Sequence, residues 1–276
     1  MHRQISELAE IEDDVRIIHL RQVHELAAAN DCPIREVELA ALEIGVVPWR
    51  YLRNLGTVGL EGQAKLLRAT VAVVGLGGLG GYVAEALARM GVGRLVLIDG
   101  DLFEEHNLNR QILSAEANLG TDKVQAARQR VAEINGAVEV IGHAVTLTRE
   151  NLPRLLGGAD VVVDALDRLP IRLTLQEGAQ ALGIPMVHGS IAGFLGQVMT
   201  IFPGDPGLRS LYGDAAELPK QGLEAQLGTP AATPMAVAAW EAQEVVKVLL
   251  DHGELLRNRL LVMDMQSGII ESLQLG

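Results

Sequence analysis

The first residues whose types and spacing could do chemistry form a glycine-rich run, Gly75-Leu76-Gly77-Gly78-Leu79-Gly80, directly after an aliphatic stretch. Glycines at these spacings let the backbone turn tightly and approach a phosphate, and a helix that begins there directs N–H groups at it. Asp99 stands 24 residues after Gly75, where a carboxylate can accept hydrogen bonds from ribose hydroxyls. The pattern predicts a nucleotide site and leaves NAD and ATP open. Its glycines are Gly75, Gly77, Gly78 and Gly80.

Two cations downstream favour ATP over a dinucleotide. Arg110 lies in the segment Asn107-Leu108-Asn109-Arg110-Gln111, and Lys123 stands at the head of the next expected helix. A triphosphate needs positive charge along its length and in the transition state, whereas a dehydrogenase has little use for these side chains. The alternative interpretation is that both are ordinary solvated surface charges.

A third group of polar side chains follows the aliphatic stretch 161–163. Asp164 and Asp167 come at its end, and Arg172 lies on the helix expected after them. Open α/β sheets bind ligands at the carboxyl ends of parallel strands, and Mg²⁺ beside a nucleotide prefers carboxylate and water oxygens. We therefore predict that Asp167 binds magnesium. The alternative is that the two carboxylates only cap the helix beginning near Leu169.

The elements that must position these residues alternate along the chain between short aliphatic strands and helical periodicity. This alternation predicts an α/β fold, with a Rossmann-like, mostly parallel sheet, helices on both faces and antiparallel C-terminal strands. The expected strands are 71–74, 95–98, 138–141, 161–163, 185–187, 196–202, 260–263 and 269–273. The expected helices are 79–90, 123–134, 150–156, 169–182 and 235–250.

The N-terminal residues have a different pattern. Apolar side chains between Ile5 and Leu26 recur at helical spacing and predict one amphipathic helix. Pro33 breaks this helix, and a second helix is expected over 34–43. We expect a helical extension over 1–48 and a nucleotide-binding domain over 49–276. The Gly- and Pro-rich stretch 203–234 is expected to be a mobile crossover loop.

Composition excludes several classes of protein. The chain has 276 residues, with 35 acidic and 23 basic side chains and a formal net charge of -12, which argues against a nonspecific nucleic-acid binder. No apolar stretch approaches the roughly 20 residues that span a bilayer. The acidic N-terminus resembles neither a signal peptide nor a transit peptide. We therefore expect a cytoplasmic protein with no membrane or nucleic-acid partner.

The combination of motifs resembles the adenylation domain of the MoeB/ThiF/HesA family, bacterial relatives of ubiquitin-activating enzymes. The resemblance covers about 49–276 and includes Arg50-Tyr51-Leu52-Arg53-Asn54, which is similar to the family's RYxRQ segment. It implies an adenylyltransferase that uses ATP and Mg²⁺ on the C-terminal glycine carboxylate of a ubiquitin-like sulfur carrier of the MoaD/ThiS type, ending in Gly-Gly. The products would be an acyl-adenylate and pyrophosphate. The pathway would make molybdopterin or tungstopterin, thiamine, or cysteine.

The resemblance also implies roles for single residues. Arg53 would reach the triphosphate from the neighbouring subunit of a homodimer, and Asp167 would hold magnesium. No general base would be needed, because a carboxylate is already ionised at neutral pH. Catalysis would then rest on positioning and on charge neutralisation by Arg53, Arg110, Lys123 and the metal. The residues that would hold the nucleotide are Gly78, Asp99 at the ribose, and Asn107, Arg110 and Lys123 at the phosphates.

The sequence departs from the family pattern at its cysteines. Many members hold a structural zinc with two CxxC pairs, but Pro206-Gly207-Leu208-Arg209 stands at the first pair, and one cysteine per chain cannot form a Cys₄ site. We therefore expect no zinc. The loop 222–229, where some relatives carry a nucleophilic cysteine, has none, and Glu224 stands near that position. A separate protein would thus donate the sulfur, and Cys32 is expected to be a packing residue.

The same residues are also compatible with other functions. A dinucleotide-dependent oxidoreductase is supported only by the glycine run and Asp99. Relatives that act on a small carboxylate, a peptide C-terminus or a tRNA base are a second alternative, and a catalytically inactive nucleotide-binding scaffold is a third. A scaffold would not need the four charges Arg53, Arg110, Lys123 and Asp167.

Arg168, where the family usually has Asn, has no assigned role. His188, at a predicted strand end facing the presumed site, is expected to be packed or hydrogen-bonded.

Overall fold

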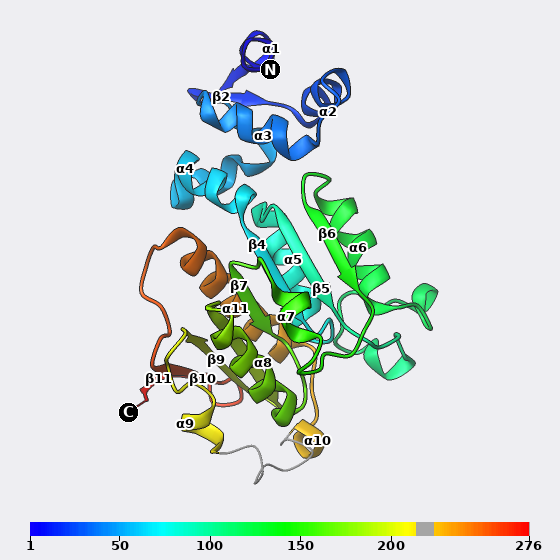
Figure 1. Ribbon diagram of the computed structural model, residues 1–276, viewed down its shortest axis with the longest axis vertical. Coiled ribbons are helices and arrows are strands. Elements are labelled where there is room, and N and C mark those ends of the chain that lie inside the picture. Colours follow the sequence, from blue (N-terminus) through cyan, green and yellow to red (C-terminus); the bar gives the residue numbers. More distant parts are fainter. Residues whose placement is uncertain (214–223, 276) are drawn as a thin grey trace.

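An eight-stranded sheet with the order β11-β10-β9-β8-β7-β4-β5-β6 forms the centre of the molecule (Figure 1). The computed structural model describes residues 1–213 and 224–275. The strands of this sheet are β4 (Thr70–Val74), β5 (Arg94–Ile98), β6 (Glu139–His143), β7 (Val161–Asp164), β8 (Met186–Ala192), β9 (Leu195–Ile201), β10 (Arg259–Asp264) and β11 (Ile269–Gln274).

The strand directions confirm the predicted fold class. Strands β6, β5, β4, β7 and β8 pair in parallel, whereas β8, β9, β10 and β11 pair in antiparallel order. The last residues of the parallel strands stand side by side, since Val74 pairs with both Ile98 and Asp164, and Asp164 also pairs with His188. The sheet therefore brings the ends of three predicted strands to one edge.

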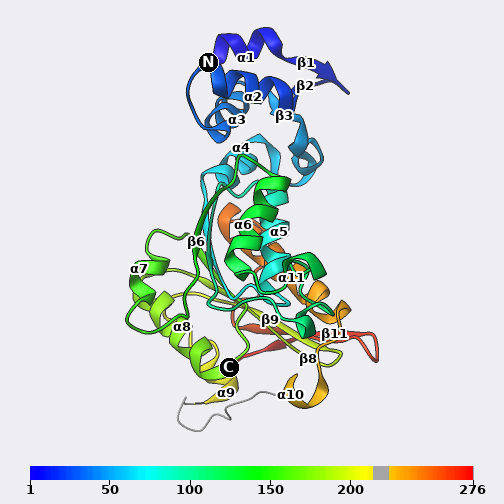
Figure 2. The ribbon, with the colours of Figure 1, turned by 90° about the vertical axis from the view of Figure 1, so that its right-hand side faces the viewer.

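Helices cover both faces of the sheet (Figure 2). Helices α7 and α8 lie on one face, while α5, α6 and α11 lie on the other. Strand β4 serves both cores, because Val71 and Val73 join one apolar cluster and Ala72 and Val74 the other, as the alternation of side chains along a strand requires. The helices are α5 (Gly80–Met90), α6 (Lys123–Ile134), α7 (Leu152–Leu156), α8 (Leu169–Ala181) and α11 (Ala232–Leu250).

The N-terminal segment forms a small unit at one end of the molecule (Figure 1). The single amphipathic helix expected between Ile5 and Leu26 is wrong, because a β-hairpin interrupts it. Asp13 and Asp14 have φ angles of 47° and 63°, the geometry of a tight hairpin turn. The second helix is confirmed. The unit contains α1 (His2–Leu8), β1 (Glu10–Glu12), β2 (Val15–Ile18), α2 (Leu20–Ala29), α3 (Ile34–Glu43) and β3 (Val47–Pro48).

Two elements that were not predicted connect this unit to the sheet. The 3-10 helix η1 (Trp49–Asn54) runs into α4 (Leu55–Arg68), which ends directly before β4. Helix α4 is kinked at Gly59, whose φ of 67° and ψ of 179° are non-helical. Two further 3-10 helices, η2 (Glu105–Asn107) and η3 (Glu116–Asn118), follow β5.

The expected loop over 203–234 is partly helical in its described portion. It contains α9 (Arg209–Tyr212) and α10 (Glu224–Leu227), and α11 begins within it. Residues 214–223, including the first part of the stretch 222–229, lie outside the described residues.

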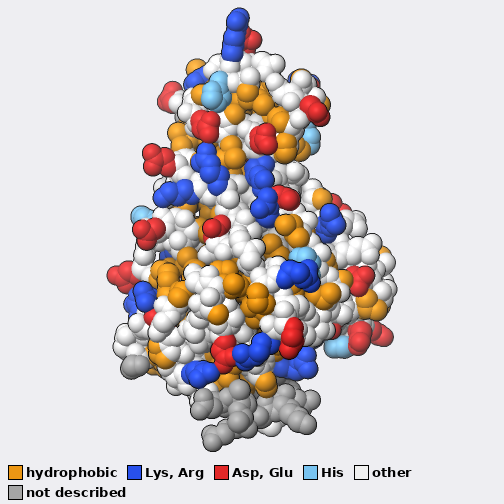
Figure 3. All heavy atoms as spheres, viewed as in Figure 1, with side chains coloured by type: hydrophobic (Ala, Val, Ile, Leu, Met, Phe, Trp, Pro, Cys, Tyr) orange, Lys and Arg blue, Asp and Glu red, His pale blue; other side chains and the backbone are white. Residues whose placement is uncertain are grey.

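The surface of the molecule is not uniform in character. On the face shown in Figure 3, Lys and Arg side chains gather where the N-terminal unit meets the larger body. Within residues 1–213 and 224–275, we find no helix with the length and apolar character needed to span a bilayer.

Candidate functional site

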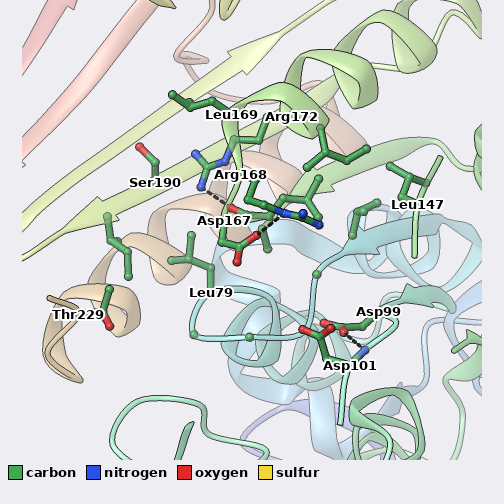
Figure 4. A pocket seen from close by; sticks show the side chains of 18 of the residues that line it. Leu79, Asp99, Asp101, Leu147, Asp167, Arg168, Leu169, Arg172, Ser190 and Thr229 are labelled. Carbon is green, nitrogen blue, oxygen red and sulfur yellow. Dashed lines mark hydrogen bonds and ion pairs between the residues drawn. The ribbon is translucent and has the colours of Figure 1, made fainter. Parts of the chain in front are cut away.

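A cleft of about 790 Å³ opens at the carboxyl ends of β4, β5 and β7 (Figure 4). Its walls come from the glycine run after β4, the turn after β5, the segment around Arg110, the start of α6 and the loop after β7. Seven of the predicted site residues line this cleft: Gly75, Gly77, Gly78, Asp99, Arg110, Lys123 and Asp167.

The glycine run owes its shape to two of its members. Gly75 has a φ of 90°, in the region that favours glycine, and a Cβ there would stand 2.5 Å from the Ala165 carbonyl oxygen. A Cβ on Gly80 would overlap with the Gly75 carbonyl oxygen. Gly80 is buried at the start of α5 and does not line the cleft. It closes the turn, while Gly77 and Gly78 face the open space.

Asp99 is tied to the glycine run by its carboxylate. The Leu76 N–H donates to Oδ2 at 2.6 Å, and the Asp101 N–H donates to Oδ1 at 2.8 Å. Burial raises the pKa of Asp99, whereas Lys123 and the two backbone N–H groups lower it. The carboxylate therefore fixes the loop after β4 relative to the turn after β5, at the position predicted for ribose binding.

The two predicted cations are not ordinary solvated charges. Lys123 is only 6% exposed, and its Nζ lies 3.0 Å from Oδ2 of Asp101. Arg110 is half-buried, and its Nη1 donates to the His106 carbonyl at 2.9 Å and to Oδ1 of Asn109 at 2.8 Å. Burial lowers the pKa of Arg110 and the charge of Asp167 raises it. Arg110 and Asp167 therefore act on each other electrostatically in the cleft.

Asp167 projects from the loop after β7 toward the loop that carries Leu79 (Figure 4). Its side chain is 84% exposed, and Nε of Arg168 lies 3.8 Å away. The alternative in which Asp164 and Asp167 cap helix α8 is wrong, because Arg168 is the N-cap residue and no described side chain makes a capping hydrogen bond at that end. An accessible carboxylate opposite a glycine loop fits the way Mg²⁺ is held beside nucleotide phosphates.

Two predicted site residues lie elsewhere. Asn107 is buried outside the cleft, where its Oδ1 accepts the Glu104 N–H at 3.0 Å and caps η2. Arg53 is exposed on η1, at the amino-terminal end of the sheet, and its side chain makes no hydrogen bond or ion pair with the described residues of this chain. Because the cleft lies at the carboxyl ends of the same strands, Arg53 does not reach the cleft of its own chain.

Sequence reasoning missed Gln111, the last residue of the segment that contains Arg110. It lines the cleft and is only 6% exposed, and its buried Oε1 has no hydrogen-bond partner in the part of the chain that the structure describes. Its Nε2 faces Gly77. Its place beside Arg110 in the motif was the signal that could have identified it.

A buried polar cluster below the cleft was not predicted as a unit, although Asp164, Arg172 and His188 were each singled out in the sequence. Asp164 and His188 are fully buried, with Oδ2 and Nδ1 2.7 Å apart. His188 is thus hydrogen-bonded, as expected, but it does not line the cleft. Glu241 of α11 and Arg172 of α8 complete the cluster. Arg172 also lines the cleft, and its guanidinium donates to the Leu166 carbonyl. Sequence patterns gave no signal that α11 would place a carboxyl group here.

Cys32 lies far from the cleft, in the turn between α2 and α3. Burial raises the pKa of its thiol, and the nearby Glu36 and Asp31 raise it further. These shifts reduce the thiolate population, which is the nucleophilic form.

The arrangement is suited to binding a nucleotide with several phosphates, since a glycine loop and two cations share one cleft. The family model described as the ThiF family matches residues 51–276. The chain belongs to the ThiF family. It is 40% identical over 217 residues to the SAMP-activating enzyme E1 of Haloferax volcanii, covering 78% of this chain and 80% of that protein. It is 38% identical to the sulfur carrier protein adenylyltransferase of Thermus thermophilus, covering 78% and 82%.

One further relative and one solved structure extend the comparison. The chain is 34% identical to the adenylyltransferase and sulfurtransferase MOCS3 of Aedes aegypti, but it spans only 52% of that protein while 82% of this chain is covered. The solved structure of E. coli MccB with ATP has a TM-score of 0.72 at 24% identity, covering 82% of this chain and 72% of that one, which shows a common fold. The predicted family and the enzyme class, an adenylyltransferase, are confirmed.

Proposed function

We propose that this ThiF-family chain uses ATP to adenylate the C-terminal glycine carboxylate of a ubiquitin-like sulfur carrier protein that ends in Gly-Gly. One observation carries the proposal: Arg110, Lys123 and Asp167 meet at one cleft beside the glycine run. The names of two relatives, an activating enzyme and a carrier protein adenylyltransferase, support the same reaction. The carrier serves the synthesis of a sulfur-containing cofactor, and a separate protein donates the sulfur.

The reaction requires little proton chemistry. A carboxylate oxygen of the carrier bonds to the α-phosphorus of ATP, and the bond between that phosphorus and the β-phosphate oxygen breaks to release pyrophosphate. The attacking carboxylate is already ionised, so no base is needed. Arg110 and Lys123 stabilise the negative charge of the phosphates, and Asp99 orients the ribose. Asp167 would hold magnesium, which supplies further neutralisation when it is bound.

The position of Arg53 supports a site that is shared between two subunits. Arg53 lies at the opposite end of the sheet from the cleft of its own chain, and its side chain is exposed. In a homodimer that places η1 of one subunit over the cleft of the other, Arg53 adds a third cation at the triphosphate. We propose this arrangement.

The proposed reaction is tested by replacing its cations. Arg110→Ala or Lys123→Ala should lower the rate of carrier-dependent ATP–pyrophosphate exchange by at least about tenfold, because each removes a charge from the reacting phosphates. Arg128→Ala is the matched control, since Arg128 is an exposed arginine on the same helix as Lys123. Circular dichroism should show an intact fold in all three variants. Wild-type exchange in both the Arg110 and the Lys123 variant would contradict the assignment.

The oxidoreductase alternative has a simple test of its own. ATP with Mg²⁺ should raise the thermal unfolding midpoint of the chain, because a ligand that binds the folded state stabilises it. NAD should not. Stabilisation by NAD alone would favour the alternative.

A further inference from the structure

A buried carboxylate links the N-terminal unit to the segment that carries Arg53. Glu38 of α3 is fully buried. Its Oε2 accepts a hydrogen bond from the Tyr51 hydroxyl at 3.0 Å, and its Oε1 lies 3.4 Å from Nε of Arg50. Leu42, one turn further along α3, packs with Tyr51 in a small apolar cluster. Helix α3 thus holds the first half of η1 by charge, hydrogen bond and packing.

The same segment is held from the other side by the larger body. Nδ2 of Asn135 donates to the Tyr51 hydroxyl at 2.8 Å and to the Ala88 carbonyl at 3.0 Å. Oδ1 of Asn135 accepts a hydrogen bond from Nη1 of Arg50. A chain of polar contacts therefore runs from Glu38 through η1 to the ends of α5 and α6.

A second anchor lies on the far side of Arg53. Nδ2 of Asn54 donates to Oε1 of Gln63 at 2.9 Å, and Nε2 of the buried Gln63 donates to the Met90 carbonyl at 2.9 Å. Gly91 makes room for both anchors, because a Cβ there would stand 2.6 Å from the Tyr51 ring and 2.8 Å from Gln63. Arg53 is therefore the exposed residue between two fixed points.

We propose that the N-terminal unit is a positioning element for Arg53, with Glu38 as the positioning residue that sets the orientation of η1 toward the cleft of the partner subunit. This inference rests on the proposed function, in which Arg53 acts across the dimer. Glu38 touches no substrate and acts through Arg50 and Tyr51.

Stability alone gives no reason for a charge at this junction. Buried ion pairs can often be replaced by apolar side chains with no loss of stability, so packing of Leu42 against Tyr51 would suffice to dock the unit. A directional pair between Glu38 and Arg50 fixes orientation as well as contact, which an arginine that must reach a separate subunit requires.

The test uses heterodimers in which only one site works. A donor subunit carrying Asp167→Ala keeps Arg53, and an acceptor subunit carrying Arg53→Ala keeps Asp167, so the one complete site takes Arg53 from the donor. Glu38→Gln is then placed in the donor or in the acceptor. It keeps an acceptor for the Tyr51 hydroxyl and removes the charge facing Arg50. Glu36→Gln, on the exposed face of the same helix, is the matched control.

Exchange is measured with a small ubiquitin-like protein ending in Gly-Gly, encoded in the same genome, at about pH 8, above the pKa of about 7 of Glu38. Glu38→Gln in the donor should lower the rate at least about fivefold, and in the acceptor it should have no effect. A purely structural role would lower both equally. Equal effects, or none, would overturn the inference while leaving the proposed function intact. An inactive heterodimer with no Glu38 change would overturn the shared site and the inference that rests on it, but not the adenylation reaction, which the Arg110 and Lys123 variants test.

A second measurement needs no carrier. A nitroxide label attached at Arg53→Cys, in a Cys32→Ser background, reports the motion of η1 by electron paramagnetic resonance. Glu38→Gln should increase the label's mobility and Glu36→Gln should not. Unchanged mobility in the Glu38 variant, with urea unfolding showing both variants folded, would also overturn the inference.

Discussion

Among the described residues, the buried carboxyl group of Glu241, below the cleft, has no hydrogen-bond partner. Both of its oxygens are buried and unpaired, and Gly189 leaves it room, since a Cβ at Gly189 would overlap with its carboxyl group. Burial raises the pKa of Glu241 well above its ordinary value, the nearby charge of Asp164 raises it further, and Arg172 lowers it. The folded chain therefore keeps this proton to a higher pH than the unfolded chain does.

This difference predicts the pH dependence of stability. Above about pH 4.5, the unfolded chain has lost the Glu241 proton and the folded chain has not, so the free energy of unfolding falls as pH rises toward the raised pKa. The side chain in Glu241→Gln stays neutral at every pH, so this variant should lack the fall. The free energy of unfolding of the variant minus that of the wild type should therefore grow between about pH 5 and pH 8. Urea unfolding of both proteins across this range measures the difference.

The comparison between the two proteins isolates Glu241 from its neighbours. The pKa of His188 is lowered, mainly by burial. As pH falls below about 6.5, the unfolded chain gains this proton before the folded chain does, so stability falls in both proteins and the effect cancels in the difference. A constant difference in unfolding free energy at all pH values would contradict the raised pKa of Glu241.

At the scale of elements, the turn from β4 into α5 separates two uses of glycine. Gly80 has no room for a Cβ, because the Gly75 carbonyl oxygen occupies that place. A Cβ on Gly77 would meet the Gln111 side chain at ordinary contact distance, no nearer than 3.6 Å. Gly80→Ala should destabilise the fold by about 3 kcal/mol or more, as overpacking does. Gly77→Ala should leave stability nearly unchanged and weaken ATP binding, because the methyl group enters the cleft.

Two measurements on the same pair of variants check this. Thermal unfolding without nucleotide should separate Gly80→Ala from the wild type, and calorimetric titration with ATP should separate Gly77→Ala. If the two variants behave alike in both measurements, the division of the glycine run into a structural and a binding part is wrong.

The elements that could be predicted from sequence are those that bury an apolar face. Strands β4, β5 and β7 and helices α6 and α8 were expected within a few residues of their bounds, because their aliphatic runs end at polar residues or glycine. Helix α4 was not expected, because Gly56, Gly59 and Gly62 lower its intrinsic helix propensity. Tertiary packing of Leu66 and Leu67, both fully buried, outweighs that cost.

The candidate site could be predicted where its residues follow the ends of parallel strands, since a parallel sheet brings such ends to one edge. Asp99 and Asp167 are of this kind. Contacts that depend on the packing of distant helices left no local pattern, which is why Glu241 and the junction between Glu38 and Asn135 were missed. The hairpin at Asp13 was missed because its flanking residues also fit a helical repeat.

At the scale of the whole molecule, a site shared between subunits makes activity depend on assembly. If Arg53 acts across a dimer, the exchange rate per chain should fall on dilution in parallel with the fraction of dimer, because a monomer lacks the third cation at its cleft. Sedimentation velocity over the same concentrations gives that fraction, with a dimer near twice 29.5 kDa.

Arg53→Ala separates assembly from catalysis. It should form the same dimer as the wild type, since the exposed Arg53 side chain makes no hydrogen bond or ion pair with the described residues of its own chain, yet show little exchange at any concentration. A rate per chain that stays constant while the dimer dissociates would contradict a shared site.

The contacts of Tyr51 also set an order of events during synthesis on the ribosome. Asn135, which holds Tyr51 against the larger body, is made 84 residues after it. At about 5 to 20 residues per second, the growing chain spends roughly 4 to 17 s without that partner. The N-terminal unit emerges first but docks late, so the orientation of Arg53 is fixed only once α6 has been translated.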